Sequence, residues 1–190
     1  MIDPEKIAVI FLAAGESHRF GQANKLLATL DGRPVVSHAS ELIASCGFGA
    51  MVAVCSDDRV ASLAARSGFT VVRNDAPSDG LSHSLALGID AVPSTSEAAL
   101  VCLADMPWVT AAHLRTLLAA FDPPTTPIIA SDRAGRAMPP ALFDRSCFKE
   151  LRRQTGDRGA RDLLTAAARV SAGARILADI DSPPDLTSDL

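Results

Sequence analysis

Apolar runs of strand length alternate with apolar residues at helical spacing along most of this chain, and this alternation constrains the fold more than any other feature. A helical pattern follows each run before the next run begins, which predicts βαβ units. We therefore expect an α/β fold with a mostly parallel sheet and helices on both faces. The expected strands are Ile7–Leu12, Met51–Cys55, Thr70–Val72, Ala99–Leu103 and Pro127–Ala130.

The predicted helices have recognisable first and last residues. Pro34 is typical of a first helical position, and Gly47 and Gly68 are typical of the residue after a helix. The last third of the chain is less regular, because Ser131–Pro140 is rich in Gly, Pro and charge. The expected helical faces are Val35–Cys46, Val60–Ala64, Leu81–Val92, Leu114–Phe121 and a helix with Leu163 and Leu164, and a final strand is expected at Arg175–Ile180.

Length and charge narrow the class of protein. The 190 residues fit one domain, and the net charge of −4 argues against a nucleic-acid partner or a polybasic membrane contact. The first six residues are polar and the apolar stretch after them is too short to span a bilayer. The cysteines are scattered, so we expect free thiols and a cytoplasmic protein; they are Cys46, Cys55, Cys102 and Cys147.

A loop rich in small and basic residues follows the first predicted strand. Gly15 and Gly21 allow backbone N–H groups to approach phosphate oxygens, and Arg19 and Lys25 supply fixed positive charge. The loop is not G-x-x-x-x-G-K-[ST], because Leu26 follows the lysine, and it is not G-x-G-x-x-G. We predict a triphosphate cradle, although loop cations are commonly just solvated. Its expected nucleotide-binding residues are Leu12, Ala13, Ala14, Gly15, Ser17, Arg19 and Lys25.

Acidic side chains follow two other predicted strands. Asp105 comes directly after Ala99–Leu103, at the edge of the sheet where the first loop also lies. Carboxylates there hold Mg²⁺ together with substrate phosphates, whereas the simpler interpretation is a turn or capping aspartate. Asp179 and Asp181 flank Ile180, and we expect only one of them to face a site. We choose Asp181 as the second metal ligand.

Two further polar segments begin predicted helices. Ser78 and Asp79 satisfy ordinary capping, so the polar residues that follow indicate a base or ribose site that includes Asp79, Gly80, Leu81 and Ser82. Gly156–Arg161 has two arginines at a helix start, which suits an anionic second substrate. A surface turn is the simpler explanation of that segment. The expected acceptor-binding residues are Arg158, Gly159 and Arg161.

Taken together and in order, these blocks resemble the MobA-like nucleotidyltransferase family, and within it the molybdenum cofactor cytidylyltransferases. The matching blocks are Leu12–Leu27, Asp79–Leu85, Leu103–Pro107, Gly156–Arg161 and the closing Asp179–Asp185. The resemblance implies a Rossmann-like three-layer α/β/α nucleotidyltransferase fold, Mg²⁺ dependence and release of pyrophosphate. It implies catalytic roles for Arg19, Lys25 and Asp105. The nucleotide-binding part is expected over roughly residues 1–110 and the acceptor-binding part over roughly 111–190.

The resemblance also suggests the nucleotide and marks two departures. Ala14 stands where guanylyl-transferring relatives more often carry Gly, which favours CTP over GTP. Arg136–Pro140 has no histidine where the family often has Gly-His-Pro, and Pro184 replaces the usual Glu. The role that the family gives the histidine is therefore in doubt for this chain.

Three functions remain open from the sequence. The first is transfer of CMP from CTP to a molybdopterin-type cofactor, with a client molybdoenzyme as a partner. The second keeps the fold and changes the base or acceptor, as in a guanylyltransferase or a sugar- or alcohol-phosphate nucleotidyltransferase. The third is a non-catalytic chaperone that binds and delivers the molybdenum cofactor.

Overall fold

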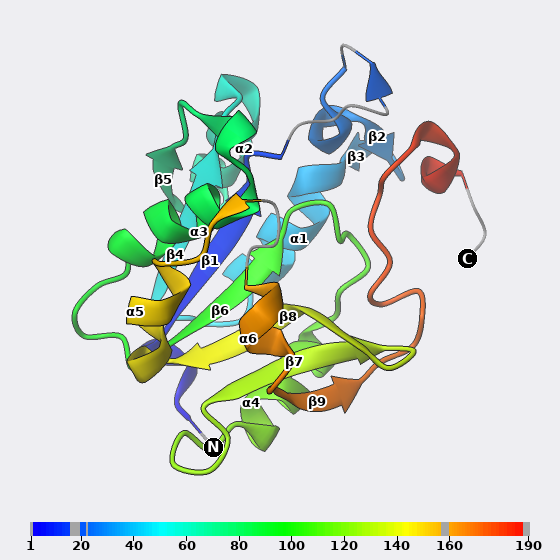
Figure 1. The fold of residues 1–190 in the computed structure, drawn as a ribbon. Helices are drawn as coiled ribbons and strands as arrows, with labels where there is room; N and C mark the ends of the chain where they lie inside the picture. The colour runs from blue at the N-terminus through cyan, green and yellow to red at the C-terminus, as the bar shows by residue number, and fades with distance from the viewer. Residues whose placement is uncertain (1, 16–19, 22, 157–159, 188–190) are drawn as a thin grey trace.

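A seven-stranded sheet forms the centre of the computed structural model, which describes residues 2–15, 20–21, 23–156 and 160–187 (Figure 1). The strand order is β5-β4-β1-β6-β8-β7-β9, and β8 alone runs antiparallel to its neighbours in the described sheet. The prediction of a mostly parallel α/β sheet is confirmed. The strands are β1 (Ile7–Ala13), β4 (Ala50–Cys55), β5 (Thr70–Arg73), β6 (Ala98–Leu103), β7 (Ile128–Arg133), β8 (Arg136–Asp144) and β9 (Ala168–Ser171).

Alternate residues of β1 face two different hydrophobic layers. Ile7, Val9 and Phe11 pack with α1, α2 and α4, whereas Ile10 and Leu12 pack with α3, α5 and α6. The sheet therefore lies between two helical layers, as expected for a strand buried on both faces. The helices are α1 (Val35–Ala44), α2 (Asp58–Arg66), α3 (Leu81–Asp90), α4 (Ala111–Ala120), α5 (Phe148–Leu151) and α6 (Arg161–Leu164).

Short elements connect these layers. A small two-stranded sheet pairs β2 (Thr29–Leu30) with β3 (Arg33–Pro34), next to the first loop (Figure 1). Side chains cap several helix starts: Asp57 accepts from the N–H groups of Arg59 and Val60, and Thr110 accepts from that of His113. The 3₁₀ helices are η1 (Pro4–Lys6), η3 (Lys25–Leu27), η4 (Pro77–Asp79), η5 (Arg145–Cys147) and η7 (Pro183–Leu186).

The segment 131–140 is more regular than the sequence suggests, because it forms most of the β7–β8 hairpin. Prolines in a strand normally argue against it, since they lack a ladder donor. Here the register jumps from the pair Ala130–Ala141 to the pair Ser131–Met138, which places both prolines, 139 and 140, in a bulge outside the ladder. The Ser131 hydroxyl donates to the Pro140 carbonyl at 2.7 Å.

The expected final strand at Arg175–Ile180 is wrong. The parallel edge strand is β9, and residues 175–180 form a turn followed by irregular chain. Leu177, Ala178 and Ile180 are all buried, so burial does not alternate along the segment. The Ile180 N–H donates to the Asp105 carbonyl at 2.8 Å instead of joining a ladder.

The cysteine prediction is confirmed, because all four thiols are free. Cys55 and Cys102 are buried, and burial raises the pKa of Cys55 to about 11. Among the helices that the structure describes, none has the length and apolar character to cross a membrane.

Close packing of α3 on the sheet yields a test of the fold. An alanine normally stabilises a helix by about 1 kcal/mol relative to glycine. A Cβ at Gly88, however, would lie 2.4 Å from Ile10 Cγ2 and 3.3 Å from Val54 Cγ2. We expect Gly88→Ala to lower the free energy of unfolding by about 1–3 kcal/mol in urea denaturation. Gly173→Ala, whose Cβ would meet no atom within 4 Å, is the control, and a stabilised Gly88→Ala would contradict the packing.

Candidate active site

Three charged side chains from distant parts of the sequence meet at the carboxyl edge of the parallel strands. Lys25 begins η3, Asp105 follows β6, and Asp181 lies near the C-terminus. Lys25 Nζ lies 2.6 Å from Asp105 Oδ2 and 3.3 Å from Asp181 Oδ1. The side chains of Lys25 and Asp105 are only 13% and 18% exposed, so this is a largely buried ion pair.

Backbone hydrogen bonds fix the carboxylate of Asp105 in this position. The Ala104 N–H donates to the Leu12 carbonyl at 3.0 Å, which ties the end of β6 to the end of β1. The Asp105 carbonyl accepts the Ile180 N–H, which brings the chain that carries Asp181 alongside. Residues two apart in a strand would share one face, but this segment is not a strand, and its two aspartates point to different places. Asp181 contacts Lys25, whereas Asp179 lines a neighbouring cleft.

Burial and charge shift the titration of this pair. Burial raises the pKa of Asp105, against the opposing effect of Lys25. Burial alone would lower the pKa of Lys25, but Asp105 and Asp181 outweigh it and raise that pKa above its ordinary value. The second oxygen of Asp105, Oδ1, is buried and has no hydrogen-bond partner among the described residues.

An unpartnered carboxylate oxygen beside a phosphate-sized cleft fits a divalent cation. Within the described residues, no group of three or more His, Cys, Asp or Glu side chains is placed to hold a metal. A dedicated all-protein cage is therefore absent from that part of the chain. Mg²⁺ commonly uses one or two carboxylates plus substrate phosphates, and Asp105 with Asp181 matches that donor set.

The first cleft, named here the loop cleft, opens directly in front of Lys25 and has a volume of about 410 Å³. A Cβ at Gly15 would meet no atom within 4 Å, so the cleft is open at that residue. The side chain of Asn74 is buried and donates to Ser84 Oγ at 2.9 Å, which fixes a hydroxyl at the wall. The lining comprises Leu12, Ala13, Ala14, Gly15, Lys25, Leu26, Pro77, Ser78, Gly80, Leu81, Ser84, Leu103 and Asp105.

The second cleft, named here the arginine cleft, has a volume of about 510 Å³. It shares Leu12, Leu81 and Leu103 with the loop cleft, so the two are adjacent. Three guanidinium groups and one carboxylate line an otherwise apolar wall. The charged residues are Arg133, Arg136, Arg161 and Asp179, and the apolar ones include Leu85, Val101, Ala137, Met138, Pro139, Phe143 and Leu164.

The structure brings most of the predicted site residues to these clefts. Asp79 and Ser82 do not line the loop cleft, and Ser82 Oγ is buried without a hydrogen-bond partner among the described residues. Four predicted residues lie outside the described residues: Ser17, Arg19, Arg158 and Gly159. The loop cleft does include Leu12, Ala13, Ala14, Gly15, Lys25, Gly80, Leu81 and Asp105, and the arginine cleft includes Arg161.

Sequence reasoning missed Arg133 and Arg136 as site residues. Arg133 ends β7 and Arg136 begins β8, so the hairpin brings both to the cleft edge. Pro139 and Pro140 argued against a strand in this segment, so the sequence did not predict the hairpin. The run of polar residues Ser82-His83-Ser84 indicated a base or ribose site, and of these three Ser84 lines the loop cleft.

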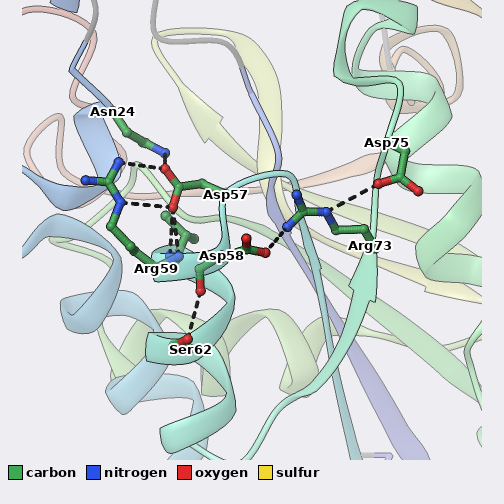
Figure 2. Close-up of polar contacts among 8 residues, drawn as sticks. Asn24, Asp57, Asp58, Arg59, Ser62, Arg73 and Asp75 are labelled. Atoms are coloured by element: carbon green, nitrogen blue, oxygen red, sulfur yellow. Dashed lines mark hydrogen bonds and ion pairs between the residues drawn. The ribbon is translucent and has the colours of Figure 1, made fainter.

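Asn24 connects the lysine loop to the helix that follows β4 (Figure 2). Its Oδ1 accepts the Leu26 N–H at 3.0 Å, and its Nδ2 donates to Asp57 Oδ2 at 3.3 Å. Asp57 also accepts from the Arg59 guanidinium at 2.9 Å and caps α2. The Arg59 guanidinium beside Asp57 holds the pKa of that carboxyl well below its usual value. One carboxylate thus supports both the helix start and the residue next to Lys25.

Comparison with known proteins gives this geometry a family. The sequence pattern of the MobA-like NTP transferase domain matches residues 9–171. The chain belongs to that family. This MobA-like chain is 29% identical over 195 residues to the purine catabolism protein PucB of Bacillus subtilis (strain 168). The alignment covers 93% of this chain and 92% of PucB.

Solved structures share the fold of this MobA-like domain. Rv0371c of Mycobacterium tuberculosis H37Rv superposes with a TM-score of 0.81 at 24% identity over 95% of each chain. The manganese complex of Rv0371c superposes with a TM-score of 0.77 at 23% identity, over 95% of this chain and 96% of Rv0371c. The molybdopterin-guanine dinucleotide biosynthesis protein A of Archaeoglobus fulgidus gives 0.71 at 20% identity over 95% of each chain. The Rossmann-like nucleotidyltransferase fold expected from the sequence is confirmed.

The Asp57 carboxylate makes a pH-dependent contribution to stability. Because its pKa is lowered by folding, the contribution is complete above the ordinary value of 3.8 and is lost as pH falls below it. We expect Asp57→Ala to lower the free energy of unfolding by about 1 kcal/mol at pH 7, mainly through the lost helix cap. The difference from wild type should shrink on acidification to pH 3 in denaturant titrations. A difference that stays constant or grows would contradict the assignment; Asp122→Ala is an exposed control.

Proposed function

We propose that the protein transfers CMP from CTP to the terminal phosphate of a molybdopterin-type cofactor and releases pyrophosphate. The observation that carries the proposal is the pair of adjoining clefts, one in front of the buried Lys25–Asp105 pair and one lined by three arginines. The loop cleft would hold the nucleoside triphosphate, and the arginine cleft would hold the acceptor. This assignment keeps the nucleotide part within roughly 1–110 and the acceptor part mainly within roughly 111–190.

The loop cleft suits a triphosphate in size and charge. Ala13, Ala14 and Gly15 allow their backbone to approach phosphate oxygens, and Lys25 places an ammonium among them. Arg19 belongs to the same loop and is proposed as the second phosphate-binding cation. Asp105 and Asp181 are proposed to hold Mg²⁺, which when bound supplies neutralising charge to the triphosphate. That proposal is supported by the buried, unpartnered Asp105 Oδ1.

The chemistry needs no strong general base from the protein. The acceptor phosphate monoester has a second pKa near 6, so it is mostly a dianion at neutral pH. One of its oxygens attacks the α-phosphorus of CTP, the bond to the bridging α–β oxygen breaks, and pyrophosphate carries away the electron pair. Lys25 neutralises charge on the departing pyrophosphate. The protein therefore acts through positioning and electrostatics.

The arginine cleft favours a phosphate ester whose body can pack on an apolar wall over a sugar phosphate. Within the described residues, the Arg136 and Arg161 side chains make no hydrogen bond or ion pair, so their donors are available to an anion. Three guanidinium groups against one Asp179 leave an excess of positive charge that suits a dianion. The remaining wall is mostly aliphatic and offers few side-chain partners to the hydroxyl groups of a sugar.

The base assignment rests on Ala14 and on the walls of the loop cleft. Ala14 lines the loop cleft and is 3% exposed. Ser84, held by Asn74, offers a fixed hydroxyl to the nucleoside. A guanylyltransferase is the second candidate, because the A. fulgidus relative is named for a molybdopterin-guanine dinucleotide.

Product analysis tests this function. The protein is incubated with Mg²⁺, molybdopterin cofactor and CTP, GTP, UTP or ATP in turn, and pyrophosphate and the dinucleotide are quantified by mass spectrometry. We expect the cytosine dinucleotide from CTP, and a loss of about 10²–10³-fold in Asp105→Asn, assayed at a temperature at which circular dichroism shows that the variant is folded. Asp90→Asn, a surface partner of Arg152, is the matched control.

Other products of this assay would point to a different function. A guanine dinucleotide would replace the CTP assignment with the second candidate. Cofactor binding with no turnover of any nucleotide would favour a delivery chaperone. Full activity of Asp105→Asn with Mg²⁺ would contradict the metal assignment.

A further inference from the structure

The C-terminal strap, defined here as residues 177–181, touches both clefts. Asp179 lines the arginine cleft, and Asp181 contacts Lys25 in front of the loop cleft. Leu177 and Ile180 are fully buried, which anchors the strap in the core. The Ile180 N–H donates to the Asp105 carbonyl, so a shift of the strap would move Asp181 relative to the ion pair.

Arg133 holds the start of this strap from the acceptor side. Its Nη1 donates to the Leu177 carbonyl at 3.3 Å and lies 3.8 Å from Asp179 Oδ1. Arg133 ends β7, a strand that is paired on both sides, so its backbone is fixed in the sheet. The guanidinium therefore connects the sheet to the segment that carries Asp181.

Only one nitrogen of that guanidinium is used by the described residues. Nε and Nη2 make no hydrogen bond with them, although Arg133 lines the arginine cleft and its side chain is 39% exposed. A planar guanidinium presents its donors as a fork, so an anion can take Nε and Nη2 while Nη1 keeps the strap. An anionic acceptor then fixes the same side chain that fixes the strap.

We propose that Arg133 is a positioning residue that couples the two clefts: an anionic acceptor bound to its free donors holds the strap, and with it Asp181, in place beside Lys25. This inference rests on the proposed function for the identity of the two ligands. Its consequence is regulatory. Occupancy of the acceptor cleft strengthens nucleotide binding, and by linkage the nucleotide strengthens acceptor binding by the same factor.

Hydrogen–deuterium exchange of the full chain tests the strap without any ligand. We expect Arg133→Ala to speed amide exchange in a peptide spanning 176–182 about tenfold, because a charge-assisted hydrogen bond to Leu177 is lost. Exchange in the central strands should stay at the wild-type rate, which separates a local release from unfolding. Arg152→Ala, which removes an arginine paired with Asp90 outside both clefts, is the matched control.

Binding linkage tests the coupling itself. The Kd of the uncleavable α,β-methylene analogue of CTP is measured with Mg²⁺, with and without saturating molybdopterin. We expect molybdopterin to lower that Kd about fivefold in wild type and not at all in Arg133→Ala. Arg136→Ala should weaken molybdopterin binding yet keep the fivefold ratio at saturation. Arg133→Lys keeps a charge in the cleft but lacks the fork, so it should retain part of the acceptor affinity and lose the linkage.

The two proposals fail in distinguishable ways. Absence of both CTP-analogue and molybdopterin binding in wild type would overturn the proposed function. Unchanged strap exchange in Arg133→Ala, or a fivefold ratio that survives in that variant, would overturn the role of Arg133 even if the protein is an active nucleotidyltransferase.

Discussion

The largely buried ion pair between Lys25 and Asp105 is the interaction on which the site depends. Removing either partner of such a pair leaves an uncompensated charge, at a cost of about 3–5 kcal/mol. Apolar side chains of similar volume would make the folded state at least as stable, so stability alone does not explain a buried ion pair here. Both side chains line the loop cleft, and Asp105 Oδ1 has no partner among the described residues. The pair is therefore placed to interact with a charged ligand in that cleft.

The topology of the sheet explains why the arginine cleft adjoins the loop cleft that contains this pair. Parallel strands β1 and β6 end at the same edge and deliver Ala13–Gly15 and Asp105 there. The antiparallel β8 begins at that edge, so its first residue, Arg136, arrives next to the end of β7. A single reversal of strand direction thus adds the positively charged Arg136 to a rim otherwise built by βα loops. The strap then closes the rim by hydrogen bonding to Asp105.

The sequence predicted the first half of this arrangement well and the second half poorly, for physical reasons. Strands β1, β4 and β6 are buried on both faces and are continuous apolar runs in the sequence. The runs therefore predicted the strands and, with them, the site residues that follow β1 and β6. Strand β8 contains Pro139 and Pro140, whose place in a bulge is set by pairing with β7 and is not visible locally. The strap is positioned by hydrogen bonds to the Asp105 carbonyl and from Arg133, contacts between distant residues that no periodicity encodes. Asp179 and Asp181 were therefore expected at the end of a strand that the structure does not form.

The central claim is that Asp105 and Asp181, beside Lys25, hold a divalent cation together with a nucleoside triphosphate. Electron paramagnetic resonance of Mn²⁺ tests it most directly, by counting the free ion in the presence of protein and α,β-methylene CTP. The account predicts that wild type binds one Mn²⁺ per chain in the presence of the nucleotide and that Asp105→Asn weakens this binding by about 10–100-fold. Equal Mn²⁺ binding by wild type and Asp105→Asn would contradict it.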